Sequence, residues 1–323
     1  MRKIFVLITF LLLNQTIWSQ PLPVKLKHTI IIDTDCAIDD MRAISLLLNR
    51  PEITIKAILL SDGSLSPVEG VGKIMSLLAE FNIDTITVAC GDSLKGVNPA
   101  WRQFNRQISW GKESDKKVPG INAVDCLMEK LKNADEKVIL VCLGPLTNIA
   151  HLISKDAGLE SKVERIIWYN ESVKPLKGFN YDCDKASADL VFKSNLRIDV
   201  ISNLNKDNTL FDSSMYNVCE QSKTKLAAVL KYVYSQPAVI EKLKQNHFRL
   251  CDDLVALYIT NPELFDINII TDKLNVRYNT DYDVQAVKEA LTDMINGSYF
   301  YERNIVFNRF PVQPEMFNYD IRP

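Results

Sequence analysis

Short apolar runs alternate along the chain with longer segments in which apolar residues recur at helical spacing. The first pair is "HTIIIDTD" at 28–35, which predicts a buried strand, and "DDMRAISLLLNR" at 39–50, which predicts a helix. The remaining predicted strands cover 53–63, 84–91, 137–145, 163–170 and 197–203, and the helices between them cover 67–81, 121–134, 146–155 and 184–195. This alternation predicts an α/β fold whose mostly parallel sheet carries helices on both faces.

The rest of the chain is less regular. The segment 222–260 has a largely helical pattern, whereas the last fifty residues give no clear pattern. In an open parallel sheet, binding sites gather beyond the carboxyl ends of the strands. The polar residues that follow each predicted strand are therefore the candidates for function.

The first twenty residues have a different character. Arg2 and Lys3 precede an apolar run at 4–13, and polar residues follow it, which is the layout of a secretory signal peptide cleaved near Ser19. The alternative is a membrane anchor, but a bilayer span needs about 20 apolar residues. We therefore expect residues 1–20 to be a signal peptide and residues 21–323 to form one domain that is exported, periplasmic or secreted, without a stable membrane anchor.

Composition excludes one class of partner. The 323 residues are 47% hydrophobic with a formal net charge of -2, and no long basic run occurs, so nucleic acid is not an expected partner. The seven cysteines are odd in number and irregular in spacing, which favours buried free thiols over a disulfide framework.

Four carboxylates fall within eight positions at the first strand end. Asp33 and Asp35 end the strand, and Asp39 and Asp40 begin the next helix. Capping and turn chemistry could explain some of them, but four together exceed that need. Oxygen ligands of this kind suit Ca²⁺ or Mg²⁺, and the spacing does not fit an EF-hand loop. A second acidic rim, "CDDL" at 251–254, could supply a further ligand.

A strand that ends in DxD also begins phosphatases of the haloacid dehalogenase type, which use an aspartate nucleophile and Mg²⁺. Asp33 would be the nucleophile in that alternative. The residues after it, "CAIDD" at 36–40, do not resemble the Gly-Thr-Leu-like turn of those enzymes.

Four segments in order resemble the inosine-uridine nucleoside hydrolase family. They are "DTDCAIDD" at 33–40, "LGPLTNIA" at 143–150, "FNYDCDKASADLVF" at 179–192 and "LCDDLVALYITNPELF" at 250–265. The resemblance implies a Rossmann-like sheet, a tightly bound Ca²⁺, and hydrolysis of the N-glycosidic bond of nucleosides.

Carried over by position, the resemblance implies a calcium site formed by the side chains of Asp35, Asp39, Asp40 and Asp252 and the backbone carbonyl of Thr147. Asp33 would orient the cluster by hydrogen bonds. Asn180 and Asp39 would hold ribose hydroxyls. Asp35 would act as general base for a water that attacks C1′ of the ribosyl group.

Several positions depart from the family pattern. Ala37 stands where the family has Gly, which would carry a modest cost if that position needs positive φ. Asp62 replaces an Asn, and Trp168 to Asn170 replace Met-Gly-Gly, so Asp62, Trp168 and Asn170 are predicted to alter the sugar contacts. Gly178 replaces a Glu before Phe-Asn, which removes an expected ribose contact.

The proton donor to the leaving base is also changed. Cys251 stands where many members have His, and its thiol is either the acid or a small filler beside the metal. His247, one helical turn earlier, is a substitute candidate. Tyr232 and Tyr234 could flank the base or serve in packing.

These observations predict a calcium-dependent hydrolase of a nucleoside or related N-riboside. The alternative from another class is a noncatalytic, metal-dependent nucleoside or sugar binder. The resemblance allows a homo-oligomer, and nothing in the sequence shows an interface.

Overall fold

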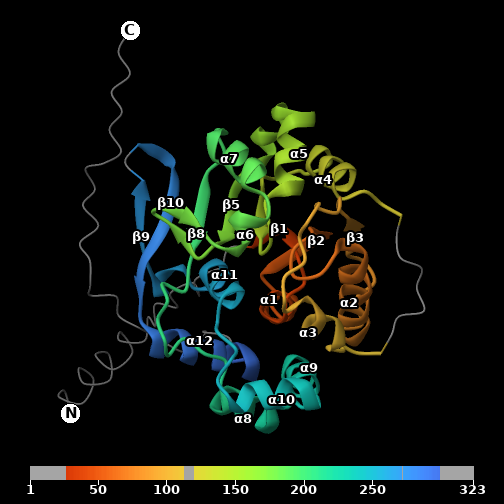
Figure 1. Cartoon of the computed structure of the whole chain (residues 1–323), viewed down its shortest axis with the longest axis vertical. Coiled ribbons are helices and arrows are strands. Elements are labelled where there is room, and N and C mark those ends of the chain that lie inside the picture. The colour runs from red at the N-terminus through yellow and green to blue at the C-terminus, as the bar shows by residue number, and fades with distance from the viewer. Residues whose placement is uncertain (1–26, 113–119, 271, 299–323) are drawn as a thin grey trace, which may run out of the picture.

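The computed structural model describes residues 27–112, 120–270 and 272–298, and its main feature is an eight-stranded sheet (Figure 1). Its spatial order is β3-β2-β1-β4-β5-β8-β10-β9. The strands are β1 (His28–Thr34), β2 (Ile53–Leu60), β3 (Thr87–Cys90), β4 (Val138–Cys142), β5 (Val163–Tyr169), β8 (Ile198–Ile201), β9 (Phe265–Ile270) and β10 (Lys273–Tyr282). All neighbours pair parallel except β9 and β10. The predicted open, mostly parallel sheet is confirmed.

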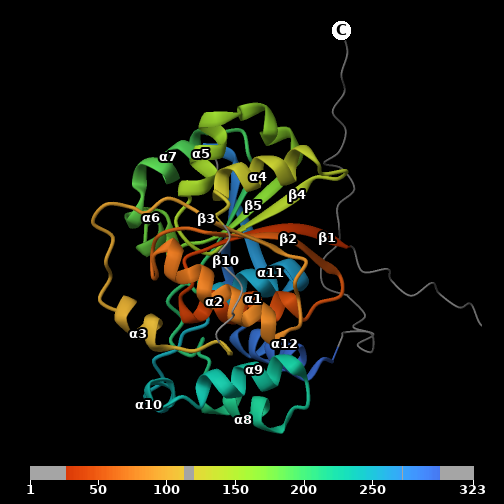
Figure 2. The same cartoon turned by 90° about the vertical axis from the view of Figure 1, so that its right-hand side faces the viewer.

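Helices cover both faces of this sheet, as the alternation of side chains along β1 shows. Ile30 and Ile32 belong to one core and Ile31 to the other. The first core lies under α1 (Ile38–Leu48), α2 (Pro67–Glu80), α9 (Lys225–Tyr234), α11 (Asp252–Thr260) and α12 (Val284–Asn296). The second lies under α4 (Ala123–Lys132), α5 (Thr147–Lys155) and α7 (Lys185–Lys193) (Figure 2).

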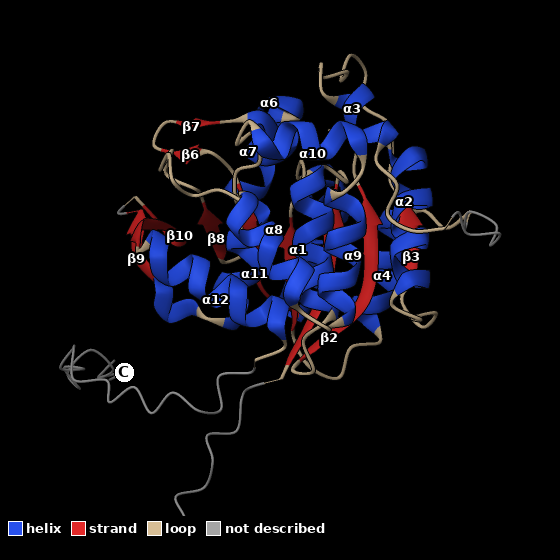
Figure 3. Cartoon of the chain, turned by 90° about the horizontal axis from the view of Figure 1, so that it is seen from below, coloured by secondary structure: helices blue, strands red, loops and turns tan. Residues whose placement is uncertain are grey.

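The sequence pattern missed several short elements that lie along one edge of the molecule (Figure 3). They are α3 (Arg102–Gln107), the hairpin strands β6 (Ser172–Val173) and β7 (Leu176–Lys177), and α6 (Phe179–Cys183). The helix α10 (Pro237–Lys244), on the same edge, lies inside the segment 222–260 that was predicted to be largely helical. Also missed was α8 (Ser213–Gln221), and two 3-10 helices span Ala157–Lys162 and Pro262–Leu264. Apart from the nine-residue α8, the missed elements have two to six residues and hold too little periodicity for a pattern to detect.

A buried ion pair joins α1 to α11. The guanidinium of Arg42 is fully buried and donates to both carboxylate oxygens of Asp253, at 2.5 Å each. It also donates to the hydroxyl of Tyr234 and, at 2.9 Å, to the backbone carbonyl of Arg249. These bonds hold the N-terminus of α11 beside the first turn of α1, where two of the acidic residues lie.

Three other predictions concern the chain as a whole. All seven cysteines are free thiols, as expected. The predicted signal peptide at 1–20 lies outside the described residues. Within the part of the chain that the structure describes, no helix combines the length and apolar character needed to cross a bilayer.

Candidate active site

A cavity of about 670 Å³ opens at the carboxyl ends of β1, β4, β5 and β8. From β1 the chain first adds β2 and β3 on one side and then returns to add β4 and β5 on the other side. Ligands usually bind at such a switch point of an open parallel sheet. The polar residues of its wall include Asp35, Asp39, Asp40, Glu171, Asn180, Asn203, Cys251 and Asp252.

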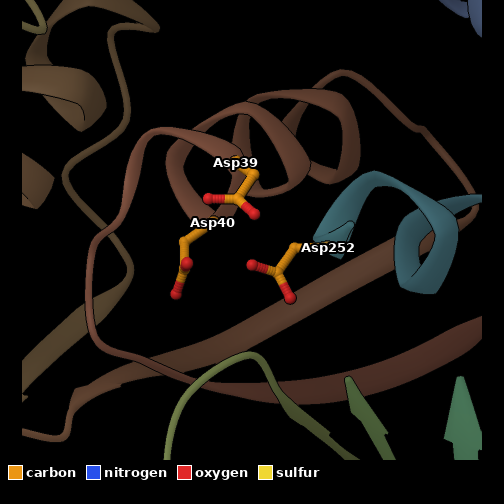
Figure 4. A group of neighbouring side chains, drawn as sticks. All are labelled: Asp39, Asp40 and Asp252. Carbon is orange, nitrogen blue, oxygen red and sulfur yellow. The ribbon is translucent and has the colours of Figure 1, made fainter. Parts of the chain in front are cut away.

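Three carboxylates from two distant segments meet in this cavity. Oxygens of Asp39, Asp40 and Asp252 lie within 4.8 Å of one another (Figure 4). Asp39 and Asp40 are in the first turn of α1, and Asp252 is the first residue of α11. Asp35, at the end of the strand that precedes α1, lines the same cavity.

The electrostatics of this cluster favour a cation. Burial, followed by the charges of neighbouring carboxylates, raises the pKa of Asp40 and of Asp252 well above the usual value. Burial likewise raises the pKa of Asp35 to about 7. The buried Oδ1 of Asp252 has no hydrogen-bond partner within the described ranges. A hard divalent cation fits this set of crowded oxygen donors.

Thr34 and Asp33, at the end of β1, make different hydrogen bonds. The hydroxyl of Thr34 donates to Oδ1 of Asp40 at 2.6 Å, and the backbone N–H of Asp35 donates to the same oxygen at 3.2 Å. The carboxylate of Asp33 instead accepts a bond from Nδ2 of Asn148 at 2.8 Å. Burial raises the pKa of Asp33 to about 7. Asp33 is buried and is not among the residues that line the cavity, and its predicted orienting role and the phosphatase alternative stay predictions.

Two glycines enclose Asp35. A Cβ at Gly63 would lie 2.1 Å from Oδ2 of Asp35, and a Cβ at Gly144 would lie 3.1 Å from its Cβ. The strain that the sequence suggested at Ala37 does not occur, because Ala37 is extended with φ -64. The left-handed residue of this loop is Cys36, with φ 60.

Leu143, and not Thr147, reaches the cavity from the segment after β4. The hydroxyl of Thr147, which belongs to α5, donates to Oδ2 of Asp184 at 2.7 Å. Leu143 lines the cavity, and its backbone carbonyl accepts a hydrogen bond from Nδ2 of Asn180 at 2.8 Å. Thr147 is the first residue of α5 and is not among the residues that line the cavity, and the carbonyl ligand predicted there stays a prediction.

Asn180, which is predicted to hold a sugar hydroxyl, lines the cavity. Its Nδ2 also donates to the carbonyl of Tyr169 at 3.0 Å, so both amide hydrogens are used by backbone carbonyls. Its Oδ1 remains as the acceptor for a ligand hydroxyl.

Three other predicted substrate contacts lie elsewhere. Asp62 is held by Arg102 at 2.7 Å and by the backbone N–H of Leu94 at 2.8 Å. Trp168 is fully buried in the core of the opposite face and donates to the carbonyl of Gly144. Asn170 is fully buried, and its Nδ2 donates to two carbonyls of the β6–β7 hairpin. None of the three side chains lines the cavity, because Asp62 and Asn170 are held by the protein's own hydrogen bonds and Trp168 is packed in the core.

Cys251 caps the beginning of α11 and faces the cavity. Burial, and then the charge of Asp39, raises the pKa of its thiol well above the usual value. Tyr169 hydrogen-bonds to this thiol, and Nδ2 of Asn203 lies 3.5 Å from Sγ. The thiol therefore keeps its proton. His247 is exposed at the cavity rim.

The aromatic part of the wall was not predicted. It consists of Trp101, Phe104, Phe179 and Phe248. Trp101 and Phe179 meet edge to face with centroids 4.8 Å apart. By contrast, Tyr234 is buried against Arg42 and Tyr232 bonds to Ser109 outside the cavity. Phe179 begins the segment at 179–192 that resembles the family, which was the only sequence signal for this wall.

Known proteins share this architecture. The family model described as inosine-uridine preferring nucleoside hydrolase matches residues 30–297. A purine-preferring ribonucleoside hydrolase from Gardnerella vaginalis superimposes with a TM-score of 0.71 at 19% identity, over 84% of this chain and 98% of that one. An inosine-uridine preferring nucleoside hydrolase from Bacillus anthracis gives 0.69 at 17% identity, over 83% and 99% of the two chains. The fold is therefore that of nucleoside hydrolases.

Curated relatives match a shorter segment. The pyrimidine-specific ribonucleoside hydrolase RihA of Shewanella sp. (strain ANA-3) is 32% identical over 188 residues, which is 54% of this chain and 58% of the relative. RihA of Escherichia coli is 29% identical over 184 residues, 52% of this chain and 58% of the relative. The family match extends over most of the chain. The chain belongs to the inosine-uridine preferring nucleoside hydrolase family.

Proposed function

We propose that the protein hydrolyses the N-glycosidic bond of a nucleoside or related N-riboside, with Ca²⁺ held by Asp39, Asp40 and Asp252. The observation that carries this proposal is the convergence of these three carboxylates inside a cavity with an aromatic wall. Oxygen donors suit a hard cation, and aromatic faces suit a planar base.

Different residues act on the sugar and on the base. When bound, the cation supplies positive charge that favours ionisation of a water and holds sugar hydroxyls. The oxygen of the water attacks C1′ as the C1′–N bond breaks, and Asp35 accepts the proton that the water loses. Oδ1 of Asn180 accepts a hydrogen bond from a sugar hydroxyl, which fixes the ring for this attack.

The electron pair of the broken bond stays on the base, which needs a proton. Cys251 is placed to give it, because its thiol is protonated and lies in the cavity. His247, at the rim, is the alternative donor. Cys251→Ala should lower kcat on nucleosides by about 10²-fold or more and leave a 4-nitrophenyl riboside, whose leaving group needs no proton, nearly unchanged. If His247→Gln shows this pattern instead, the donor is His247.

The test of the proposal is release of free ribose from purine and pyrimidine nucleosides, since the similar proteins are named for both classes. Asp35→Asn is the control, and robust activity in that variant contradicts the mechanism. Ligand binding without turnover over long incubation would select the noncatalytic binder.

We also propose export through residues 1–20. N-terminal sequencing of the mature protein from the producing cell tests this. A chain that begins near residue 20 supports it, and an intact Met1 contradicts it.

A further inference from the structure

Glu171 is a carboxylate of the cavity that the proposed chemistry does not use. It follows β5 by two residues and lines the 670 Å³ cavity beside Tyr169 and Asn180. It also borders a second cavity of about 250 Å³, next to Ser172 and Lys174. Its backbone carbonyl accepts a hydrogen bond from Oγ of Ser202 at 2.7 Å, which fixes the chain at this point.

One oxygen of this carboxylate is buried without a partner. Oε2 of Glu171 has no hydrogen bond to any atom of residues 27–112, 120–270 and 272–298. Buried polar atoms normally have a partner, so this carboxylate at the cavity wall has hydrogen-bonding capacity that the protein does not use.

The neighbouring protein donors are committed elsewhere. Both hydrogens of Asn180 Nδ2 go to backbone carbonyls. The amide of Asn203 is directed to Sγ of Cys251, and the hydroxyl of Tyr169 bonds to the same thiol. Lys174 lies with Nζ 5.2 Å from the ring centroid of Tyr278. These neighbouring side chains therefore leave the carboxylate of Glu171 available to a water or to a hydroxyl of a ligand in the cavity.

The place of this carboxylate depends on the glycine at 178. A Cβ there would lie 1.7 Å from Oε2 of Glu171 and 2.9 Å from Oδ1 of Asn170. Gly178 also has φ 136, a conformation that other residues rarely adopt. A side chain at 178 and the observed position of Glu171 are thus mutually exclusive, and the glycine makes room for the glutamate.

We propose that Glu171 determines sugar specificity by accepting a hydrogen bond from a substrate hydroxyl, and that Gly178 exists to admit its carboxylate. The inference rests on the proposed function and adds the residue that reads the sugar. Gly178 stands where the family pattern has a Glu. In this proposal Glu171 supplies that carboxylate from a different position in the chain. Its negative charge would also disfavour a phosphate at the same hydroxyl, which selects nucleosides over nucleotides.

The experiment compares Glu171→Gln with the unmodified protein on a ribonucleoside and on its 2′-, 3′- and 5′-deoxy analogues. Glu171→Gln keeps the shape and removes the charge. We expect kcat/KM on the parent nucleoside to fall about 10- to 100-fold, the range for a hydrogen bond to a charged group. On the one analogue that lacks the contacted hydroxyl, the fall should be less than about 3-fold, because the contact is already missing.

Two further variants sharpen the result. Gly178→Ala should reproduce the same pattern across the analogues, because it displaces the carboxylate. Glu136→Gln, at an exposed glutamate before β4, is the matched control and should match the unmodified protein on every substrate. Urea denaturation of each variant shows whether folding is retained.

An equal loss on all four substrates, or no loss on any, overturns the proposal. If the unmodified protein hydrolyses no nucleoside, the proposed function fails on its own. Calorimetry with ribose then tests the hydroxyl contact of Glu171. Weaker ribose binding by Glu171→Gln than by the unmodified protein then supports a hydroxyl contact. Equal binding, or no ribose binding by either protein, overturns it.

Discussion

Gly63→Ala should disable the site through one added methyl group. The new Cβ would lie 2.1 Å from Oδ2 of Asp35, 2.7 Å from its Cγ and 2.8 Å from its Cβ. Ordinary contact begins at 3.4 Å, so the oxygen must move by roughly 1.3 Å. Rotation of the Asp35 side chain alone is not enough, since its Cβ is also too close.

The surrounding hydrogen bonds resist that movement. The backbone N–H of Leu65 donates to the carbonyl of Asp35 at 2.9 Å, so this loop and the end of β1 are joined. Arg102 donates to the carbonyl of Gly63 at 2.5 Å from the other side. A displacement near 1 Å of a reacting group costs about 10²-fold in rate, and overpacking costs about 1–3 kcal/mol of stability.

The assay is kcat/KM for ribose release, with urea denaturation in parallel. Gly72→Ala is the matched control, because a Cβ there meets nothing within 4 Å and the residue lies inside α2. It should keep full activity and gain about 0.5–1 kcal/mol of stability. If Gly63→Ala stays within about 3-fold of the unmodified protein, the role given to the position of Asp35 is refuted.

Two other predictions concern stability. Arg42→Met leaves the buried carboxylate of Asp253 without its partner, so the free energy of unfolding in urea should fall by about 3–5 kcal/mol. Arg106→Met, at an ion pair that is largely exposed, should change it by less than about 1 kcal/mol, and equal effects would contradict the argument. In protein freed of divalent cations, the raised pKa values of Asp33 and Asp35, each about 7, mean that the folded state binds more protons. The stabilising contribution of these two carboxyl groups is complete below pH ~3.8 and is lost as pH rises through about 7. Calcium at 100 times its Kd should then raise the free energy of unfolding by about 2.7 kcal/mol. Thermal melts that show stability rising over this pH range without calcium would contradict it.

The alternation of strands and helices was readable because each element is long enough to show its period. The β1 run and the periodic face of α1 predicted both elements and the loop between them. The β9–β10 pair was not predicted, since Lys273–Tyr282 alternates weakly and lies almost entirely in the last fifty residues, which give no clear pattern. The grouping of Asp39 and Asp40 followed from adjacency. The acidic rim at 251–254 was a candidate for a further ligand, and the family resemblance selected Asp252 within it.

Other parts of the site depend on three-dimensional arrangement that no local pattern carries. Leu143 contributes a backbone carbonyl, which has no residue-type signal. Asp62 and Asn170 carry the polar groups expected of substrate contacts, yet the fold uses both in its own hydrogen bonds. Gly178 replaces an expected ribose contact, and its close approach to Glu171 is visible only in the three-dimensional structure.

The central claim is that hydrolysis requires a divalent cation held by Asp39, Asp40 and Asp252. The measurement is the rate of ribose release by chelator-treated protein as calcium is added back, for the unmodified chain and for Asp252→Asn. We predict no turnover without the cation, saturable recovery with calcium, and a calcium requirement at least about 10-fold higher in the variant, since even outer partners of a metal site change affinity by that much. Full turnover after chelation, or the same calcium dependence in both proteins, would contradict the account.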